Sequence, residues 1–232
     1  MGIRDQSMKI TVFVVLTCFL SAVALAGTQD QAKLALHYMG TCDLCQPDYC
    51  GAFFTPNIPC SEYNTDYFFS GIVITIGYLV LAHGDSTSGV AGVQFGITHS
   101  PSFSVLNWYL CGDAEMPHDS NAGESWPSPG SGNRVTWDPD TNCQRNVIED
   151  EGVHVVVGAL SIYTYAAGTF SVTPDSTLAN PTFIVTDCLG EESFSSAQGG
   201  VIGYMEEGFN PCLDSTPVEP STWGQIKARY GN

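Results

Sequence analysis

Four oxygen-bearing side chains are spaced in a way that could bind calcium. Asp138, Asp140 and Asn142 form a D-x-D-x-N pattern, and Glu149 stands at the twelfth position counted from Asp138. An EF-hand loop has this order of oxygen ligands, with a terminal Glu completing the shell. Cys143 replaces the glycine that such a loop needs at its sixth position, and no helical pattern flanks the segment. The pattern therefore predicts a looser calcium site, and the alternative is a polar loop with an Asp-Pro turn.

The cysteines could form crosslinks or bind zinc. Cys18 lies in an apolar N-terminal run, and the other eight are Cys42, Cys45, Cys50, Cys60, Cys111, Cys143, Cys188 and Cys212. An even number in an exported chain predicts disulfides. Chain order favours the pairs Cys111–Cys143 and Cys188–Cys212, with the four cysteines at 42–60 pairing among themselves. The alternative is a zinc site on Cys42-x2-Cys45 with Cys50 and Cys60, which requires reduced thiolates.

Side chains that could catalyse hydrolysis do not form a recognisable site. The doublets Glu191-Glu192 and Glu206-Glu207 offer carboxylates for glycoside hydrolysis, but adjacent residues on a strand face opposite sides of the sheet. His83 and Asp85 lie close to Ser88 without a nucleophile-elbow pattern. The sequence therefore favours a non-enzymatic module with a structural or adhesive role. A hydrolase with an unrecognised site is the last alternative.

Aromatic side chains are the candidate groups for glycan binding. A flat platform for sugars could include Trp108, Tyr109, Trp126, Trp137, Tyr163 and Tyr165. Most of them are expected in the core or as loop anchors, because Trp and Tyr bury large areas.

The charge of the chain disfavours one class of partner. It has 7 basic and 24 acidic residues and a formal net charge of −17, which becomes −18 if Arg4, Asp5 and Lys9 leave with residues 1–26. Such a surface repels phosphate backbones and anionic lipids, so no nucleic acid partner is expected. Calcium, glycans, a cell-surface partner and self-association stay open.

The N-terminus has the three parts of a signal peptide. Lys9 supplies the positive charge, residues 10–20 form an apolar run, and small residues end in Ala24-Leu25-Ala26. The run is shorter than the roughly 20 residues of a membrane-spanning helix. We expect cleavage after Ala26 and a secreted or cell-surface protein with no transmembrane segment left.

The elements that must position these residues are strands. Apolar, β-rich runs bounded by turn-forming residues predict strands near 33–39, 68–82, 90–99, 102–111, 133–138, 153–165, 168–174, 182–188 and 199–205. Helical periodicity is almost absent. The chain is therefore predicted to be all-β, with two sheets packed as a sandwich and loops stapled by disulfides.

Local patterns add detail to this fold. Residues 71–81 lack alternation, which predicts either a strand covered on both faces or two strands joined at Gly77. Turn residues at 84–89 predict a hairpin between the second and third strands, and Ala167-Gly168 predict another between the sixth and seventh. The segment 112–132 is expected to lie over an edge of the sandwich, held there by Trp126.

Three parts are expected along the chain. Residues 1–26 are the signal peptide, 27–213 the disulfide-rich sandwich domain, and 214–232 a Pro/Ser linker with a short tail motif. The tail, Trp223 to Tyr230, contains Lys227 and Arg229 and is either a docking or sorting peptide or a frayed end.

Several segments resemble one protein family. They are residues 32–37, 78–97, 126–137, 142–144, 187–188, 208–212 and 222–227. Through them the chain is similar to a family of uncharacterised secreted, cysteine-containing proteins from environmental bacteria. This resemblance implies secretion and brings no activity with it. The succession of a strand, a short acidic turn and a Gly-Val/Phe-Gly strand is also similar to cohesin-like modules, which implies a cohesin-like or jelly-roll-like β-sandwich and no function.

Overall fold

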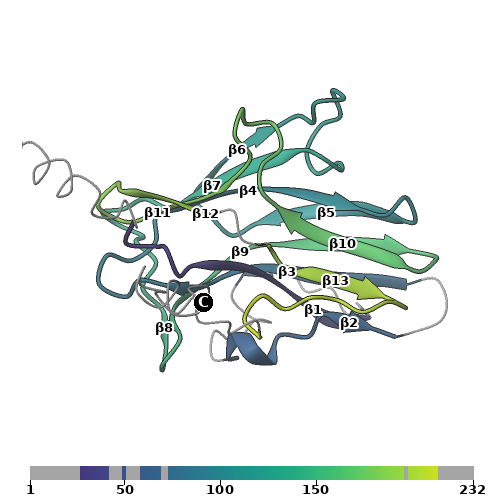
Figure 1. Ribbon diagram of the computed structural model, residues 1–232, viewed down its shortest axis with the longest axis horizontal. Helices are drawn as coiled ribbons and strands as arrows, with labels where there is room; N and C mark the ends of the chain where they lie inside the picture. Colours follow the sequence, from purple (N-terminus) through teal and green to yellow (C-terminus); the bar gives the residue numbers. More distant parts are fainter. Residues whose placement is uncertain (1–26, 42–48, 51–57, 69–72, 196–197, 214–232) are drawn as a thin grey trace, which may run out of the picture.

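The computed structural model describes residues 27–41, 49–50, 58–68, 73–195 and 198–213 (Figure 1). Its elements are β1 (Lys33–Thr41), η1 (Cys60–Glu62), β2 (Asp66–Tyr67), β3 (Val73–Gly84), β4 (Gly92–His99), β5 (Phe103–Leu110), β6 (Ala114–His118), β7 (Gly132–Thr136), β8 (Val147–Ile148), β9 (Gly152–Thr164), β10 (Gly168–Thr173), β11 (Phe183–Thr186), β12 (Glu192–Ser195) and β13 (Val201–Tyr204). The all-β prediction is confirmed. The predicted signal peptide and tail lie outside the described residues, which contain no helix able to cross a bilayer.

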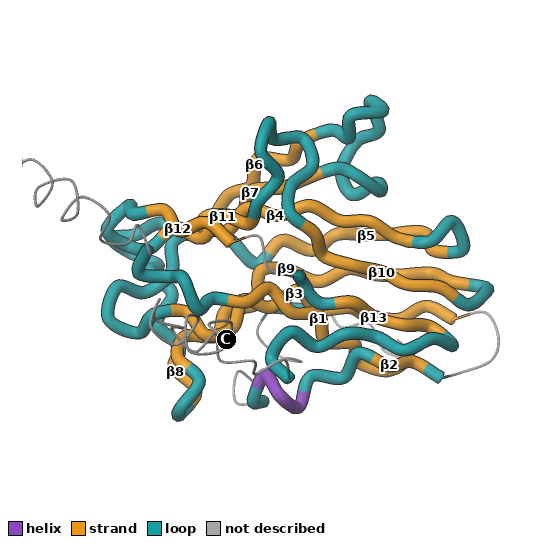
Figure 2. The backbone as a smooth tube through the Cα atoms, in the orientation of Figure 1, coloured by secondary structure: helices purple, strands orange, loops and turns teal. Residues whose placement is uncertain are grey.

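The strands form two sheets that pack face to face (Figure 2). The first has the order β1-β3-β9-β5, with β8 paired to β9, and is antiparallel throughout. The second is centred on β4, which pairs with β7, β11 and β10. Strand β6 extends it beyond β7, β12 beyond β11, and β13 with the parallel β2 beyond β10.

The main core lies between the two sheets. Leu36, Leu79 and Ile162 of the first sheet and Phe95 and Phe170 of the second belong to it and are almost completely buried. Burying one apolar face per sheet is the usual way in which a sandwich is stabilised, at about 25 cal/mol per Å² of apolar surface removed from water.

A second apolar cluster covers the outer face of the first sheet. Tyr78 and Val80 alternate along β3 with Leu79 and Leu81 and face away from the main core. Tyr63, from the segment between β1 and β2, packs on them. This confirms the prediction of a single strand covered on both faces. A strand with one exposed face alternates apolar and polar residues, whereas both faces of β3 are covered and carry apolar residues.

Both predicted hairpins are wrong. Strand β3 lies in the first sheet and β4 in the second, and the same holds for β9 and β10. In each case the chain crosses from one sheet to the other. Turn-forming residues indicate that the chain reverses direction. They do not indicate whether the next strand pairs with the previous one in the same sheet or passes to the other sheet.

The segment 112–132 contributes a strand that the sequence pattern did not predict. Residues Ala114–His118 form β6 and extend the second sheet by pairing with β7. Trp126 is half-buried against the main core, as expected. The missed strands β2, β6, β8 and β12 are two to five residues long and are held by pairing more than by an apolar pattern.

The disulfides correct the predicted pairing. The structure joins Cys50 to Cys111, Cys60 to Cys212 and Cys143 to Cys188, with Cα–Cα distances of 5.4, 5.7 and 5.9 Å. The predicted pairs Cys111–Cys143 and Cys188–Cys212 are therefore wrong, as is a closed set among the cysteines at 42–60 or a zinc site that uses Cys50 and Cys60. Sheet crossings bring together cysteines that chain order separates. Cys42 and Cys45 lie outside the described residues.

Candidate functional site

A groove of about 440 Å³ opens where β6 begins and β7 and β11 end. Its lining is mainly small or apolar and includes Ala91, Ala114 and Pro139. Three aspartates also line it, Asp113, Asp138 and Asp187. We call this feature the acidic groove.

Asp138 is held in place by the turn that follows it. Its Oδ1 accepts hydrogen bonds from the backbone N–H groups of Asp140, at 3.0 Å, and Thr141, at 2.8 Å. The hydrogen bonds from Thr141, followed by that from Asp140, lower the pKa of Asp138 from its usual value. Asp138 is therefore a fixed, exposed carboxylate at neutral pH.

Asp113 ties the start of β6 to the same loop. Its Oδ2 accepts from the backbone N–H of Asp138 at 2.8 Å, and its Oδ1 accepts from Nδ2 of Asn142 at 2.9 Å. The Oδ1 of Asn142 accepts in turn from Gln144. Two carboxylates from distant parts of the sequence thus lie beside each other.

Asp187 completes the set from the end of β11. It is fully buried, and its Oδ1 accepts from the backbone N–H groups of Leu189 and Glu191 at 2.8 and 2.9 Å. Its Oδ2 accepts from the hydroxyl of Thr28 at 2.8 Å. The adjacent Cys188 is bonded to Cys143, which links this turn to the Asp138 loop.

The four predicted calcium ligands differ in their positions relative to the groove. Only Asp138 of the four lines the groove, and Asp140, Asn142 and Glu149 are exposed. The carboxylates of Asp138, Asp140 and Glu149, all of them described, do not gather as three ligand atoms within 4.8 Å of one another. Calcium binding at this loop stays a prediction.

Three of the side chains considered for hydrolysis have structural partners. The Oδ1 of Asp85 accepts from the backbone N–H groups of Thr87 and Ser88 and from the Ser88 hydroxyl, which closes a turn. Glu192 forms an ion pair with Arg134 at 2.7 Å.

The aromatic candidates for glycan binding are spread over the molecule. Trp137 is buried, and Trp108 and Trp126 meet edge to face between the sheets with ring centroids 5.4 Å apart. Tyr109 stacks on Tyr49, and Tyr165 is 58% exposed. These positions place most of the rings in the core or against neighbouring segments. Glycan binding stays a prediction.

A polar network lies beneath the segment that covers the first sheet. The Tyr63 hydroxyl is 2.9 Å from Nδ1 of His154, whose Nε2 is 3.2 Å from Oε2 of Glu151. Burial, and then the charge of Glu151, raise the pKa of Tyr63, so its hydroxyl stays protonated. Burial lowers the pKa of His154 to about 4 although Glu151 opposes this shift. Burial also lowers the pKa of His37 and of His83.

We expect the protein to lose stability as the pH falls from 7 to 4. Below pH 6.5 the unfolded chain protonates His154, whereas the folded chain does so only near pH 4. The unfolded state therefore binds more protons in this window, and the free energy of unfolding should fall by about 2 to 3 kcal/mol. Urea denaturation at several pH values measures this slope. The His154→Asn variant keeps a polar atom near Tyr63 and should reduce the slope, leaving the smaller contribution of His37 and His83. An unchanged slope would contradict the assignment to His154.

The chain matches no protein-family model and no curated protein sequence. Solved structures similar to it are cohesin modules. A type I cohesin in a cohesin–dockerin complex from Clostridium thermocellum is 8% identical, covers 60% of this chain and 88% of its own, and has a TM-score of 0.40. The second type II cohesin module of an Acetivibrio cellulolyticus adaptor scaffoldin is 12% identical, covers 74% and 95%, and has a TM-score of 0.37. Similarity at this level transfers neither a partner nor an activity to this chain.

Proposed function

We propose that this chain is an exported, non-enzymatic β-sandwich module with a structural or adhesive role, and that it binds a basic segment of a partner protein in the acidic groove. The observation that carries the proposal is the fixed pair of exposed carboxylates, Asp113 and Asp138, beside a mainly apolar lining. The three disulfides among the described residues are typical of proteins from an oxidising compartment.

The groove suits the side chain of a lysine or an arginine. The aliphatic stem of such a residue can lie on the apolar lining while its charged end meets the carboxylates. Because backbone N–H groups already hold Asp138, binding would order few further side chains. The strong negative charge of the chain would also speed the approach of a basic partner.

The basic residues of the described part of the chain have other partners. Lys33 donates to the carbonyl oxygen of Pro211, and Arg145 donates to the carbonyl oxygen of Thr87. Arg134 pairs with Glu192. The groove carboxylates are therefore available to a basic group of another molecule. One such basic segment is residues 222–232 of a second copy of this chain, which contain Lys227 and Arg229.

Removing the charge of the groove should weaken the binding of a basic peptide. The probe is a synthetic peptide of residues 222–232, titrated by calorimetry into the chain ending at residue 213. We expect Asp113→Asn with Asp138→Asn to weaken binding about five- to tenfold, because each exposed ion pair contributes about 0.2 to 1 kcal/mol. Both substitutions keep an oxygen for the backbone hydrogen bonds.

A matched control separates the groove from the general charge. Glu206→Gln with Glu207→Gln removes the same charge from an exposed doublet outside the groove and should leave the affinity unchanged. A peptide carrying Lys227→Glu and Arg229→Glu should not bind. Equal binding by the groove variant and the parent chain would contradict the proposal.

The same titrations test the other occupants. Heat from calcium alone that disappears in an Asp138→Ala, Asp140→Ala double variant would favour calcium as the ligand of this loop. Heat from a neutral oligosaccharide alone would favour a glycan instead. Either result without peptide binding would replace the proposed function.

A further inference from the structure

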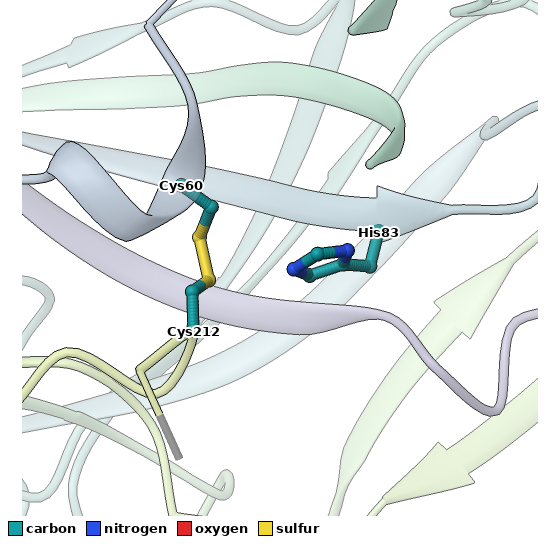
Figure 3. Close-up of side chains that lie close together, drawn as sticks. All are labelled: Cys60, His83 and Cys212. Carbon is teal, nitrogen blue, oxygen red and sulfur yellow. A yellow bond between two sulfur atoms is a disulfide. The ribbon is translucent and has the colours of Figure 1, made fainter. Parts of the chain in front are cut away.

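The Cys60–Cys212 disulfide has a histidine beside it. Figure 3 shows the ring of His83 directed toward the two sulfur atoms. A nitrogen of His83 and the two sulfur atoms all lie within 4.8 Å of one another. Cys60 is fully buried in η1, whereas Cys212 and His83 are partly exposed. Among the residues that the structure describes, no other group of His, Cys, Asp and Glu side chains meets this spacing.

The position of His83 is specified by its backbone and by Glu151. His83 has a φ of 58°, in the left-handed region that residues other than glycine adopt rarely. It is the last residue but one of β3 and lies beside residues 58–63, which cover the outer face of the first sheet. Burial lowers the pKa of His83, and a hydrogen bond with the Glu151 backbone acts in the opposite direction.

We propose that reduction of the Cys60–Cys212 disulfide opens a Zn²⁺ site made of Cys60, Cys212 and His83. Two thiolates and an imidazole are ligands that zinc prefers, at about 2.3 Å for sulfur and about 2.0 Å for nitrogen. In a tetrahedral site these lengths place the ligand atoms about 3.5 to 4 Å apart, so the two sulfur atoms must move apart from bonding distance to this separation after reduction. The site is closed while the disulfide is intact, because both sulfur atoms are bonded to each other.

A dithiol can open the site by thiol–disulfide exchange. One thiolate of the dithiol attacks Sγ of Cys212, the more exposed sulfur, and Cys60 leaves as a thiolate. The second thiol of the reagent then displaces Cys212 and closes a cyclic disulfide, so the reagent is oxidised by two electrons and the protein reduced by two. Binding of Zn²⁺ to the two thiols releases two protons.

Glu151 supports the site without belonging to its set of ligands. Its Oε2 accepts from the backbone N–H of Cys60 at 2.6 Å, but its oxygen atoms do not lie within 4.8 Å of both sulfur atoms and His83. Water is therefore the fourth ligand expected, as at other zinc sites with three protein ligands. Glu151 also fixes the neighbouring His154, so the metal site and the buried network share one carboxylate.

Cobalt binding tests the proposal. The full mature chain is titrated with Co²⁺ in the absence of oxygen, before and after reduction with a dithiol that is then removed. We expect the reduced chain to bind Co²⁺ with the sulfur charge-transfer and visible d–d bands of a tetrahedral thiolate site, and Zn²⁺ to displace it. The oxidised chain should show neither band. His83→Ala should weaken binding by at least about tenfold, since even the loss of an outer partner of a metal ligand costs that much.

Variants of the other cysteines identify the source of the signal. The bands should survive in Cys143→Ser with Cys188→Ser and in Cys42→Ser with Cys45→Ser, and should vanish in Cys60→Ser with Cys212→Ser. If the reduced chain unfolds without metal, Zn²⁺ should restore its β-sheet spectrum in the parent and not in His83→Ala, because metal binding is then coupled to folding. A signal that depends on Cys42 and Cys45, or the absence of both binding and refolding, would overturn the proposal.

Discussion

Replacing Cys60 and Cys212 with serine is expected to lower the free energy of unfolding by about 4 to 5 kcal/mol. The disulfide spans a sequence separation of 152 residues, and the chain-entropy treatment gives a stabilisation of this size for so long a loop. Domains of this kind have a total stability of about 5 to 15 kcal/mol, so the loss is a large fraction of the whole. Guanidinium denaturation of the oxidised parent and the double variant measures the difference.

The loss of stability should be largest at the outer face of β3. Cys60 and Tyr63 belong to the segment that covers the outer face of β3, and the disulfide fastens this segment to the end of the chain after β13. Hydrogen exchange at Tyr78 and Val80 should therefore rise more than exchange in β4, which lies in the other sheet. The pair Cys143→Ser and Cys188→Ser is the control, because it opens a disulfide that leaves the covering segment untouched. A change below about 1 kcal/mol in the first variant would mean that packing alone holds the segment.

The covering segment also shows how far the sequence could predict the fold. Nine strands were predicted close to their observed places, because burial selects β-branched and aromatic residues in runs. The absence of alternation at 71–81 correctly indicated a second covered face. The identity of the covering element could not be predicted, since residues 58–63 contain no pattern that specifies the sheet on which they lie. Connections between sheets were mistaken for hairpins for the same reason.

The candidate site was predicted only in part. Asp138 was singled out from its D-x-D spacing, and it does line the acidic groove. Asp113 and Asp187 were missed, because a local pattern contains no information on residues 25 and 49 positions away. The signal that could have found Asp187 is its neighbour Cys188. A correct pairing of Cys188 with Cys143 would have placed Asp187 beside the Asp138 loop. The wrong pairing of Cys188 and the failure to identify Asp187 thus have the same cause, which is that chain order does not show which distant segments lie together.

Asp175 is a buried carboxylate on which a further large effect is expected. It is fully buried after β10, and its Oδ2 accepts from Nε2 of Gln94 at 2.9 Å and lies 2.8 Å from Nδ1 of His118. Its Oδ1 accepts from the backbone N–H and the hydroxyl of Thr177 at 3.0 and 2.6 Å. The Cα of Gly132 approaches so closely that a Cβ there would meet the carboxylate. One carboxylate thus joins strands β4 and β6 to the loop after β10.

The lowered pKa of Asp175 shows that its hydrogen bonds outweigh the cost of burying its charge. Burial alone would raise the pKa, but the hydrogen bonds from Thr177, Gln94 and His118 together lower it below the usual value. The folded state therefore favours the charged form more than the unfolded state does. The resulting stabilisation is complete above the unfolded pKa of 3.8 and is lost as the pH falls from there through the lower folded value.

Asp175→Ala should therefore cost about 3 to 5 kcal/mol of stability at pH 7. The substitution leaves the buried donor of Gln94 and the partly exposed donors of His118 and Thr177 without their acceptor, and removing the central member of such a hydrogen-bonded set has this cost. Urea denaturation measures it, and Asp119→Asn, which changes an exposed carboxylate next to His118, is the matched control and should alter stability by less than about 0.5 kcal/mol. The difference between Asp175→Ala and the parent should shrink when both are unfolded below pH 3. A loss as small as that of the control, or a difference independent of pH, would show that Asp175 does not hold the strands and the loop together.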